Sequence, residues 1–225
     1  MKKVVAIIPA RGGSKGIPGK NIINFSGHPL LSWTIGQVKN SKLINEVYVS
    51  SDSDEILSVA KGYGAKAIKR PTEISDDMAT SESCLLHFLE QVDDVDIVLF
   101  LQATSPLRET KDIDNAINKF IEGDYDSMFS ATELEDFFIW TVDNDEIESY
   151  NYDYKNRKRR QDISGQIVEN GSFYLFKPEV LYNFSNRLGG KIGFSLMEEW
   201  KIHEIDNGED LMLCEYIFKQ KGLNR

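Results

Sequence analysis

The sequence has few cysteines and no long apolar run. Cys84 and Cys214 are the only cysteines among 225 residues, and both lie in apolar, helix-like surroundings. This favours buried core residues over a disulfide or a cysteine-based metal site. No stretch approaches the roughly 20 apolar residues that a membrane-spanning helix needs, and residues 4–8 are too few for the apolar part of a signal peptide. We therefore expect a cytoplasmic protein without a membrane partner.

Positive charge is also scarce. The chain has 26 lysines and arginines against 36 acidic residues, a formal net charge of −10. This balance argues against nucleic-acid binding, because proteins that bind nucleic acids normally present a net basic face to the phosphates. The cations gather in two places, residues 11–20 and residues 155–160. Such clustering favours binding of a small anion, although for the second run a solvated surface is an alternative.

The order of apolar patterns predicts an α/β fold. Short β-rich runs alternate with amphipathic stretches, which is typical of βαβ units in a doubly wound, mainly parallel sheet. The predicted strands are 4–8, 46–50, 65–68, 96–101, 127–131 and 167–176. The predicted helices are 30–38, 53–62, 80–92, 112–121, 178–184 and 208–219.

Between about residues 137 and 174 this pattern changes. Residues 138–142, the turn 143–145 and the stretch from Ile147 predict a hairpin outside the main sheet. We therefore predict one domain over residues 1–225 with an insertion at about 137–174. The apolar run from Phe137 to Trp140 is too long to remain exposed on a monomer, so we expect the insertion to form a homodimer interface.

A glycine-rich loop follows the first predicted strand. Residues 9–21 leave that strand at the carboxyl edge of the sheet, where ligands bind in open α/β folds. Glycines let backbone N–H groups approach phosphate oxygens, while Arg11, Lys15 and Lys20 supply the countercharge that a triphosphate needs. The loop lacks the Gly-Lys-Ser/Thr end of a Walker loop and the spacing of a dinucleotide fingerprint. It therefore predicts a phosphate-binding loop of a different kind.

Two acidic residues near the C-terminus are candidate metal ligands. Glu204 and Asp206 follow a predicted strand, and alternation would place both side chains on one face. Such a pair suits Mg²⁺ shared with phosphate oxygens. The alternative is an acidic strand end that caps the helix beginning near Gly208.

Taken together, these motifs resemble the acylneuraminate cytidylyltransferases, or CMP-sialic acid synthetases, and their relatives that act on legionaminic and pseudaminic acids. The resemblance covers nearly the whole chain. It rests on residues 10–15, 20–21, 50–56, 69–71, 102–108, 159–162 and 169–174. The related Kdo cytidylyltransferases usually have Arg in place of Lys15 and Gly-Lys-Pro in place of residues 19–21. The resemblance implies a nucleotide-diphospho-sugar transferase-like fold and dimerisation through the inserted hairpin.

The resemblance also implies the reaction and the residues that perform it. CMP would pass from CTP to the anomeric hydroxyl of a sialic-type nonulosonic acid, with Mg²⁺ as cofactor and pyrophosphate as the second product. For the nucleotide it implies Arg11, Gly12, Ser14, Lys15, Asn21, Arg70 and Ser81. For the sugar acid it implies Gln102, Arg160, Gln161, Asn170 and Tyr174, and for catalysis Arg11, Lys15, Arg159 and Arg160. For the metal it implies Asp206 and Glu204, although the family usually has Asp at both positions.

Two alternative functions remain open on the sequence. A sugar-1-phosphate nucleotidyltransferase would share the fold, but the Arg-Leu-x-Pro continuation of its glycine-rich start is absent. A catalytically inactive nucleotide-sugar-binding protein is favoured by Glu204. No His, Asp or Glu in the motifs is an obvious general base, so catalysis is expected to rest on positioning and electrostatics.

Overall fold

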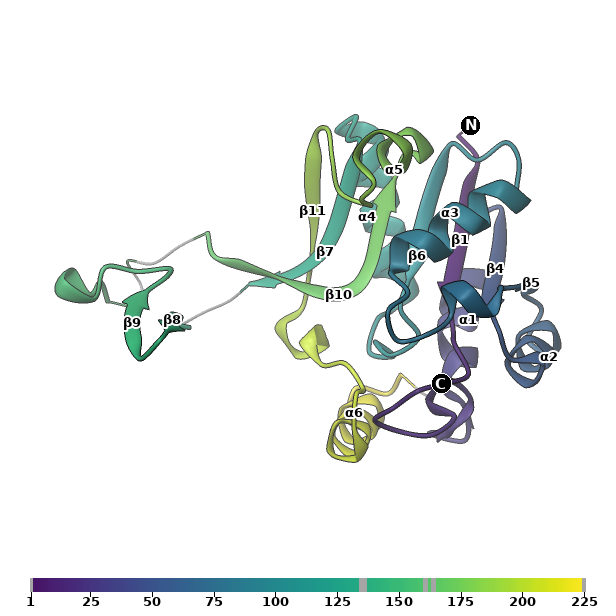
Figure 1. Ribbon diagram of the computed structural model, residues 1–225, viewed down its shortest axis with the longest axis horizontal. Coiled ribbons are helices and arrows are strands. Elements are labelled where there is room, and N and C mark those ends of the chain that lie inside the picture. The colour runs from purple at the N-terminus through teal and green to yellow at the C-terminus, as the bar shows by residue number, and fades with distance from the viewer. Residues whose placement is uncertain (1, 134–136, 160–161, 163–164, 224–225) are drawn as a thin grey trace.

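The computed structural model describes residues 2–133, 137–159, 162 and 165–223. Its centre is a seven-stranded sheet with the order β11-β7-β10-β6-β1-β4-β5 (Figure 1). The strands are β1 (Val4–Pro9), β4 (Glu46–Ser51), β5 (Lys66–Lys69), β6 (Ile97–Leu101), β7 (Ser127–Glu133), β10 (Ile167–Phe176) and β11 (Ile192–Met197). All neighbouring pairs are parallel except those made by β10, which is antiparallel to β6 and β7. The predicted α/β class with a mainly parallel sheet is confirmed.

Helices cover both faces of the sheet. One face packs against α1 (Leu30–Lys39), α2 (Asp54–Gly62) and α4 (Thr110–Glu122), and the other packs against α3 (Ser81–Gln91) and α5 (Pro178–Phe184). Helix α6 (Gly208–Gln220) joins α1 in a third apolar cluster, which includes Phe25, Phe218 and Ile205. This third cluster holds the segment around residue 205 against the start of α1 and the loop before it.

The central strands are buried on both faces, which explains why they read as continuous apolar runs. Along β1, Val4, Ala6 and Ile8 belong to the core of the first face, while Val5 and Ile7 belong to that of the second. All five residues of β6 are buried as well. Cys84 and Cys214 are buried free thiols, as predicted.

Helices α2 and α3 begin where short polar side chains cap them. The Ser53 side chain accepts a hydrogen bond from the Ile56 N–H at the start of α2, and the Thr80 side chain accepts one from the Ser83 N–H at the start of α3. The cap of α3 is therefore Thr80, and Ser81 is the first helical residue.

The structure differs from prediction around residues 190–206. Strand β11 was not predicted, because its inward positions include Gly193 and Ser195, whereas Ile192, Phe194 and Leu196 point outward. The prediction of a strand that leads into residue 203 was wrong. A 3₁₀ helix, Glu199–Ile202, takes that place and buries the Lys201 side chain.

The inserted hairpin is present. Strands β8 (Trp140–Asp143) and β9 (Glu146–Ser149) pair antiparallel around Asn144 and Asp145, which have φ values of 47° and 69°. Two successive positive φ angles are typical of a type I′ hairpin turn. The hairpin lies apart from the main sheet, beyond the ends of β7 and β10 (Figure 1). Its role in dimerisation, and the assignment of a single domain, stay predictions.

Among the residues that the structure describes, none of the helices is both long and apolar enough to cross a membrane.

Candidate active site

A cavity of about 540 Å³ opens at the carboxyl edge of the parallel strands. It is formed where β1, β5 and β6 end and where α3 begins, so its lining comes from segments far apart in the sequence. The lining includes eight residues predicted for ligand or metal binding: Arg11, Ser14, Lys15, Asn21, Arg70, Ser81, Gln102 and Asp206. The structure therefore brings together the nucleotide-binding residues implied by the sequence, apart from Gly12.

The glycine-rich loop is held in shape by contacts with Asp52, Asn21 and the backbone of Asp206. The Gly12 N–H donates to Asp52 Oδ1 at 2.9 Å, and the buried Asn21 donates from Nδ2 to the Arg11 carbonyl at 3.0 Å. A Cβ at Gly16 would collide with the backbone carbonyl of Asp206. Gly12 thus directs its N–H to Asp52, and Gly16 permits close approach to the segment around residue 206.

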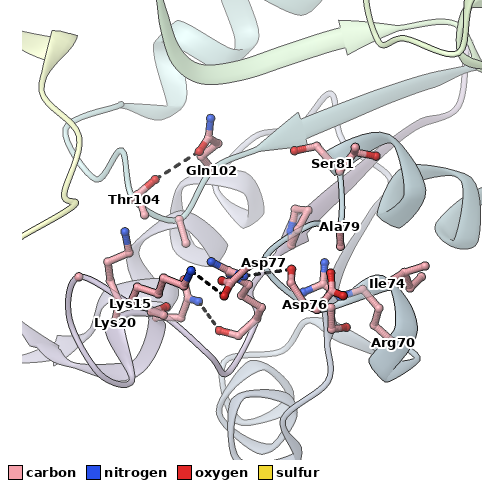
Figure 2. A pocket seen from close by; sticks show the side chains of 18 of the residues that line it. Lys15, Lys20, Arg70, Ile74, Asp76, Asp77, Ala79, Ser81, Gln102 and Thr104 are labelled. Carbon is pink, nitrogen blue, oxygen red and sulfur yellow. Dashed lines mark hydrogen bonds and ion pairs between the residues drawn. The ribbon is translucent and has the colours of Figure 1, made fainter.

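Two cations of the loop, Arg11 and Lys15, converge on one carboxylate. Arg11 Nη1 lies 2.8 Å from Asp77 Oδ1, and Lys15 Nζ lies 2.8 Å from Asp77 Oδ2. In Figure 2, Asp77 lies between the lysines of the loop on one side and Arg70 on the other. The ammonium of Lys15, followed by the guanidinium of Arg11, lowers the pKa of the Asp77 carboxyl. Asp77 was not among the predicted site residues.

Arg70 faces the cavity with unused hydrogen-bond donors. It follows β5, its N–H donates to the Ser51 carbonyl at 2.9 Å, and only 7% of the residue is exposed. Within the described residues, its buried Nε and Nη2 have no hydrogen-bond partner. Buried polar groups are nearly always paired, so an unpaired guanidinium that lines a cavity indicates a ligand with acceptor oxygens.

Gln102 is placed by a buried arginine. Arg108, which is 1% exposed, donates from Nη1 to the Ser172 carbonyl at 2.7 Å and from Nη2 to the Gln102 carbonyl at 3.3 Å. Burial lowers the pKa of Arg108 to about 9, against the opposing effect of nearby carboxylates. Arg108 therefore fastens the turn after β6 to β10, and this turn forms one wall of the cavity.

The two predicted metal ligands lie in different surroundings. Asp206 lines the cavity, its side chain is 75% exposed, and Oδ1 pairs with Lys20 Nζ at 2.9 Å. Glu204 is less exposed and lies against Gly171, where a Cβ would collide with Glu204 Oε1. Burial, followed by the negative charge of Asp206, raises the pKa of Glu204. Glu204 is not in the cavity lining, and the two residues follow a 3₁₀ helix instead of the predicted strand.

Asn170 and Tyr174 are not brought to the cavity. Asn170 is buried and accepts a hydrogen bond from Ser130 Oγ at 2.6 Å. Tyr174 stacks on Phe100 with ring centroids 5.5 Å apart and donates its hydroxyl to Glu169. Burial raises the pKa of Tyr174 to about 12. Phe100 lines the cavity, so Tyr174 supports the cavity wall from behind.

The second cationic run, residues 155–160, belongs to the insertion, and Arg159 is its one predicted site residue that the structure describes. It pairs with Asp162 at 2.8 Å and is not in the cavity lining. Arg160 and Gln161 lie outside the described residues.

A separate acidic group surrounds a buried lysine. Among the described residues, the one set of three acidic side chains with oxygens within 4.8 Å of one another is Glu109, Asp112 and Glu198. Lys201 Nζ contacts all three, at distances of 2.5–2.8 Å, and its side chain is fully buried. The ammonium groups of Lys201 and of Lys111, which pairs with Glu109 and Glu198, offset most of the negative charge of this group. We interpret the group as a structural ion cluster.

Comparison with known proteins then decides the family. A family model described as Cytidylyltransferase matches residues 5–216. The chain belongs to the cytidylyltransferase family. The resemblance drawn from the motifs is thereby confirmed, and the family match disfavours the sugar-1-phosphate nucleotidyltransferase alternative.

Two relatives of this cytidylyltransferase bear more specific names. N-acylneuraminate cytidylyltransferase A of Danio rerio is 37% identical over 217 residues, which cover 95% of this chain and 50% of the relative. The chain thus spans about half the length of that relative. Pseudaminic acid cytidylyltransferase of Campylobacter jejuni is 40% identical over 184 residues, which cover 77% of this chain and 78% of the relative.

The fold also matches solved structures. A CMP:2-keto-3-deoxy-manno-octonic acid synthetase complexed with CTP superimposes with a TM-score of 0.74 at 18% identity, over 98% of this chain and 100% of the other. At this identity the likeness establishes the fold alone.

Proposed function

We propose that this cytidylyltransferase transfers CMP from CTP to the anomeric hydroxyl of a sialic-type nonulosonic acid. The observation that carries the proposal is the buried Arg70, which lines a cavity together with Arg11, Lys15 and Lys20 and whose Nε and Nη2 have no partner among the described residues. Four cationic side chains in an acidic protein suit a ligand as highly charged as a triphosphate. The named relatives act on N-acylneuraminate and pseudaminic acid, which supports the sugar class.

The proposed reaction is a single displacement. The anomeric oxygen attacks the α-phosphorus of CTP and loses its proton to water, while the bond from that phosphorus to the bridging oxygen breaks and pyrophosphate leaves. Negative charge grows on the leaving phosphates, and Arg11 and Lys15 are placed to stabilise it. Ser14, Asn21 and Ser81 line the same cavity and would hold the remaining polar groups of the nucleotide.

The residues present fit a magnesium ion. Mg²⁺ prefers oxygen ligands and commonly binds through one or two carboxylates together with substrate phosphates. Asp206 supplies such an oxygen in the cavity lining, and Glu204 lies two residues earlier. We propose that Asp206 holds the ion and that Glu204 assists. When bound, Mg²⁺ would neutralise charge on the phosphates of CTP.

The sugar end of the site is proposed to involve two subunits. Gln102 lines the cavity, whereas Arg159 lies on the insertion, away from the cavity of its own chain. In a homodimer joined through the insertion, the Arg159, Arg160 and Gln161 segment would approach the partner's sugar acid, and guanidinium groups suit its carboxylate. We also propose a cytoplasmic location, in keeping with its free buried thiols.

The direct test measures pyrophosphate release from CTP in the presence of Mg²⁺ and a panel of nonulosonic acids. Release with at least one acid, and none without it, is expected. No release with any acid, despite measurable CTP binding, would instead support the inactive nucleotide-sugar-binding protein.

The phosphate loop provides the first mutational prediction. Arg11→Ala and Lys15→Ala should each lower turnover by roughly a hundredfold or more, because charge stabilisation on a transferring phosphate is worth several kcal/mol. Lys66→Ala is the matched control, since Lys66 is 58% exposed, pairs with Glu46 and lies outside the cavity lining. Near-normal turnover of either loop variant would contradict the assignment.

A further inference from the structure

We propose that Asp77 is an internal anion that occupies the position of the triphosphate and competes with CTP and pyrophosphate for Arg11 and Lys15. This inference rests on the proposed function and concerns how the same site fills and empties. Asp77 uses both carboxylate oxygens, one for each cation, at 2.8 Å. A phosphate group presents oxygens to such cations in the same way, so the two anions cannot bind these donors together.

Asp77 has few other attachments. In the described part of the chain, its carboxylate bonds only to Arg11 and Lys15, and its side chain is 45% exposed. It lies in an exposed turn beside Met78, which is 87% exposed. The turn is anchored on either side, by the bond from Ser75 Oγ to the Pro71 carbonyl at 2.7 Å and by the Thr80 cap of α3. The Asp76 carbonyl in this turn also accepts a hydrogen bond from Arg11 Nη1 at 3.1 Å, so withdrawal of Asp77 would release that contact as well, while the flanking elements stay anchored.

The exchange would help the site to empty. After transfer, pyrophosphate sits among cations that hold it tightly, and its departure would leave those cations unpaired. Asp77 restores two ion pairs as pyrophosphate leaves, which lowers the affinity of the site for this product. Arg70 has no internal anion among the described residues, so it retains unpaired donors for the next nucleotide.

The expected change in anion affinity follows from the exposure of the three charged side chains. The side chains of Arg11, Lys15 and Asp77 are 35%, 74% and 45% exposed, so water and salt weaken their mutual attraction. Exposed ion pairs are weak, and displacement of two of them should reduce anion affinity by roughly three- to tenfold. Asp77 would thus tune affinity without closing the site.

The experiment measures the dissociation constants of pyrophosphate and of CTP by calorimetry, in magnesium-free buffer, for the wild type, Asp77→Asn and Asp76→Asn. Asp76 is the matched control: it lines the same cavity and carries the same charge, but among the described residues its carboxylate accepts a hydrogen bond only from the Met78 N–H. Both variants remove one negative charge, whereas only Asp77→Asn removes the competitor. Melting temperatures establish that both variants fold.

We expect Asp77→Asn to bind both probes about three- to tenfold more tightly than the wild type, and more tightly than Asp76→Asn. Equal tightening in the two variants would reduce the effect to general electrostatics and overturn the inference. Weaker binding by Asp77→Asn would also overturn it, because Asp77 would then orient the cations for phosphate. A wild type that binds neither probe would overturn the proposed function together with the inference.

Discussion

Glu204 and Asp206 are neighbours in the chain, yet their carboxylates have different surroundings. Asp206 is exposed at the cavity and paired with Lys20, whereas Glu204 is partly buried against Gly171. A hydrated magnesium ion reaches an exposed carboxylate in the lining of a cavity more easily than one that is partly buried. Asp206 is therefore the stronger candidate for the metal ligand.

This ranking leads to a prediction. Asp206→Asn should abolish magnesium-dependent activity while it retains an oxygen acceptor for Lys20 Nζ, because the amide lacks the charge that holds the ion. Glu204→Asp should preserve activity, since it restores the acid usual in the family. Pyrophosphate release measured over a range of Mg²⁺ concentrations checks both variants. Equal loss in the two would show that Glu204 ligates as firmly as Asp206.

The residues at the site could be predicted from sequence when a motif carried them. Arg11, Lys15, Arg70 and Gln102 all line the cavity, as expected for residues at the ends of neighbouring parallel strands. Asp77 could not be found in this way, because an acidic pair in a polar stretch also reads as a solvated surface. Its partner Arg11 lies 66 residues away, and only the fold brings the two together.

At the scale of elements, β10 links the cavity to the insertion. Its register shifts between Glu169 and Tyr174, and Gly171 lies in that irregularity with φ at +65°. This backbone conformation places the Gly171 Cα against Glu204 Oε1 and close to the Gln102 side chain. Glycine is needed here for two reasons: it adopts a positive φ without strain, and it has no side chain that would collide with Glu204.

Gly171→Ala should therefore impair both stability and sugar binding. The positive φ costs an alanine on the order of 1 kcal/mol, and the added Cβ must also displace Glu204. We expect the melting temperature to fall below that of the wild type. We also expect the KM for the sugar acid to rise more than the KM for CTP. Thermal unfolding and steady-state kinetics measure these changes.

Gly27→Ala separates the two causes. Gly27 also has a positive φ, +95°, but a Cβ there would have no neighbour within 4 Å. This control should lose stability through backbone strain alone and keep its KM values. If the KM for the sugar acid is unchanged in Gly171→Ala, the irregularity of β10 around Gly171 does not contribute to the sugar site.

Strands could be predicted from the sequence where burial alone determined their pattern of apolar residues. Strands β1 and β6 are apolar throughout because helices cover both of their faces. Strand β11 lies at the edge of the sheet and buries Gly193 and Ser195, so it lacks an apolar inward row. The segment before His203 was mistaken for a strand because its 3₁₀ helix is stabilised by the distant carboxylate of Asp112 on Lys201.

At the scale of the whole molecule, the insertion carries an unusual amount of exposed apolar surface. Exposed fractions are 57% for Phe137, 70% for Val142, 67% for Ile147 and 73% for Tyr150. An isolated two-stranded hairpin is only marginally stable in water, and a large exposed apolar patch marks an interaction site. A second copy of the chain is the partner we propose, since two-fold dimers are the commonest way to bury such a patch.

The contacts inside the insertion indicate which side chains test this proposal. The ring centroids of Phe138 and Tyr152 lie 4.4 Å apart, and Trp140 contacts Tyr152 and Tyr154. Substitution of Phe138 or Trp140 would therefore also disturb the hairpin itself. Val142 and Ile147 are directly opposed across the hairpin and mostly exposed. They are therefore the better targets.

The double variant Val142→Glu with Ile147→Glu should be monomeric and less active. Two like charges at the centre of an apolar interface would meet their copies across the two-fold axis, and separation of the subunits would remove the basic segment of each from the other's sugar site. Light scattering alongside the pyrophosphate assay checks both effects. Tyr182→Glu, at a 58% exposed position on α5, is the matched control and should remain dimeric and active. A wild-type chain that is monomeric at micromolar concentration and fully active would contradict the dimer but leave the chemistry of the cavity in place.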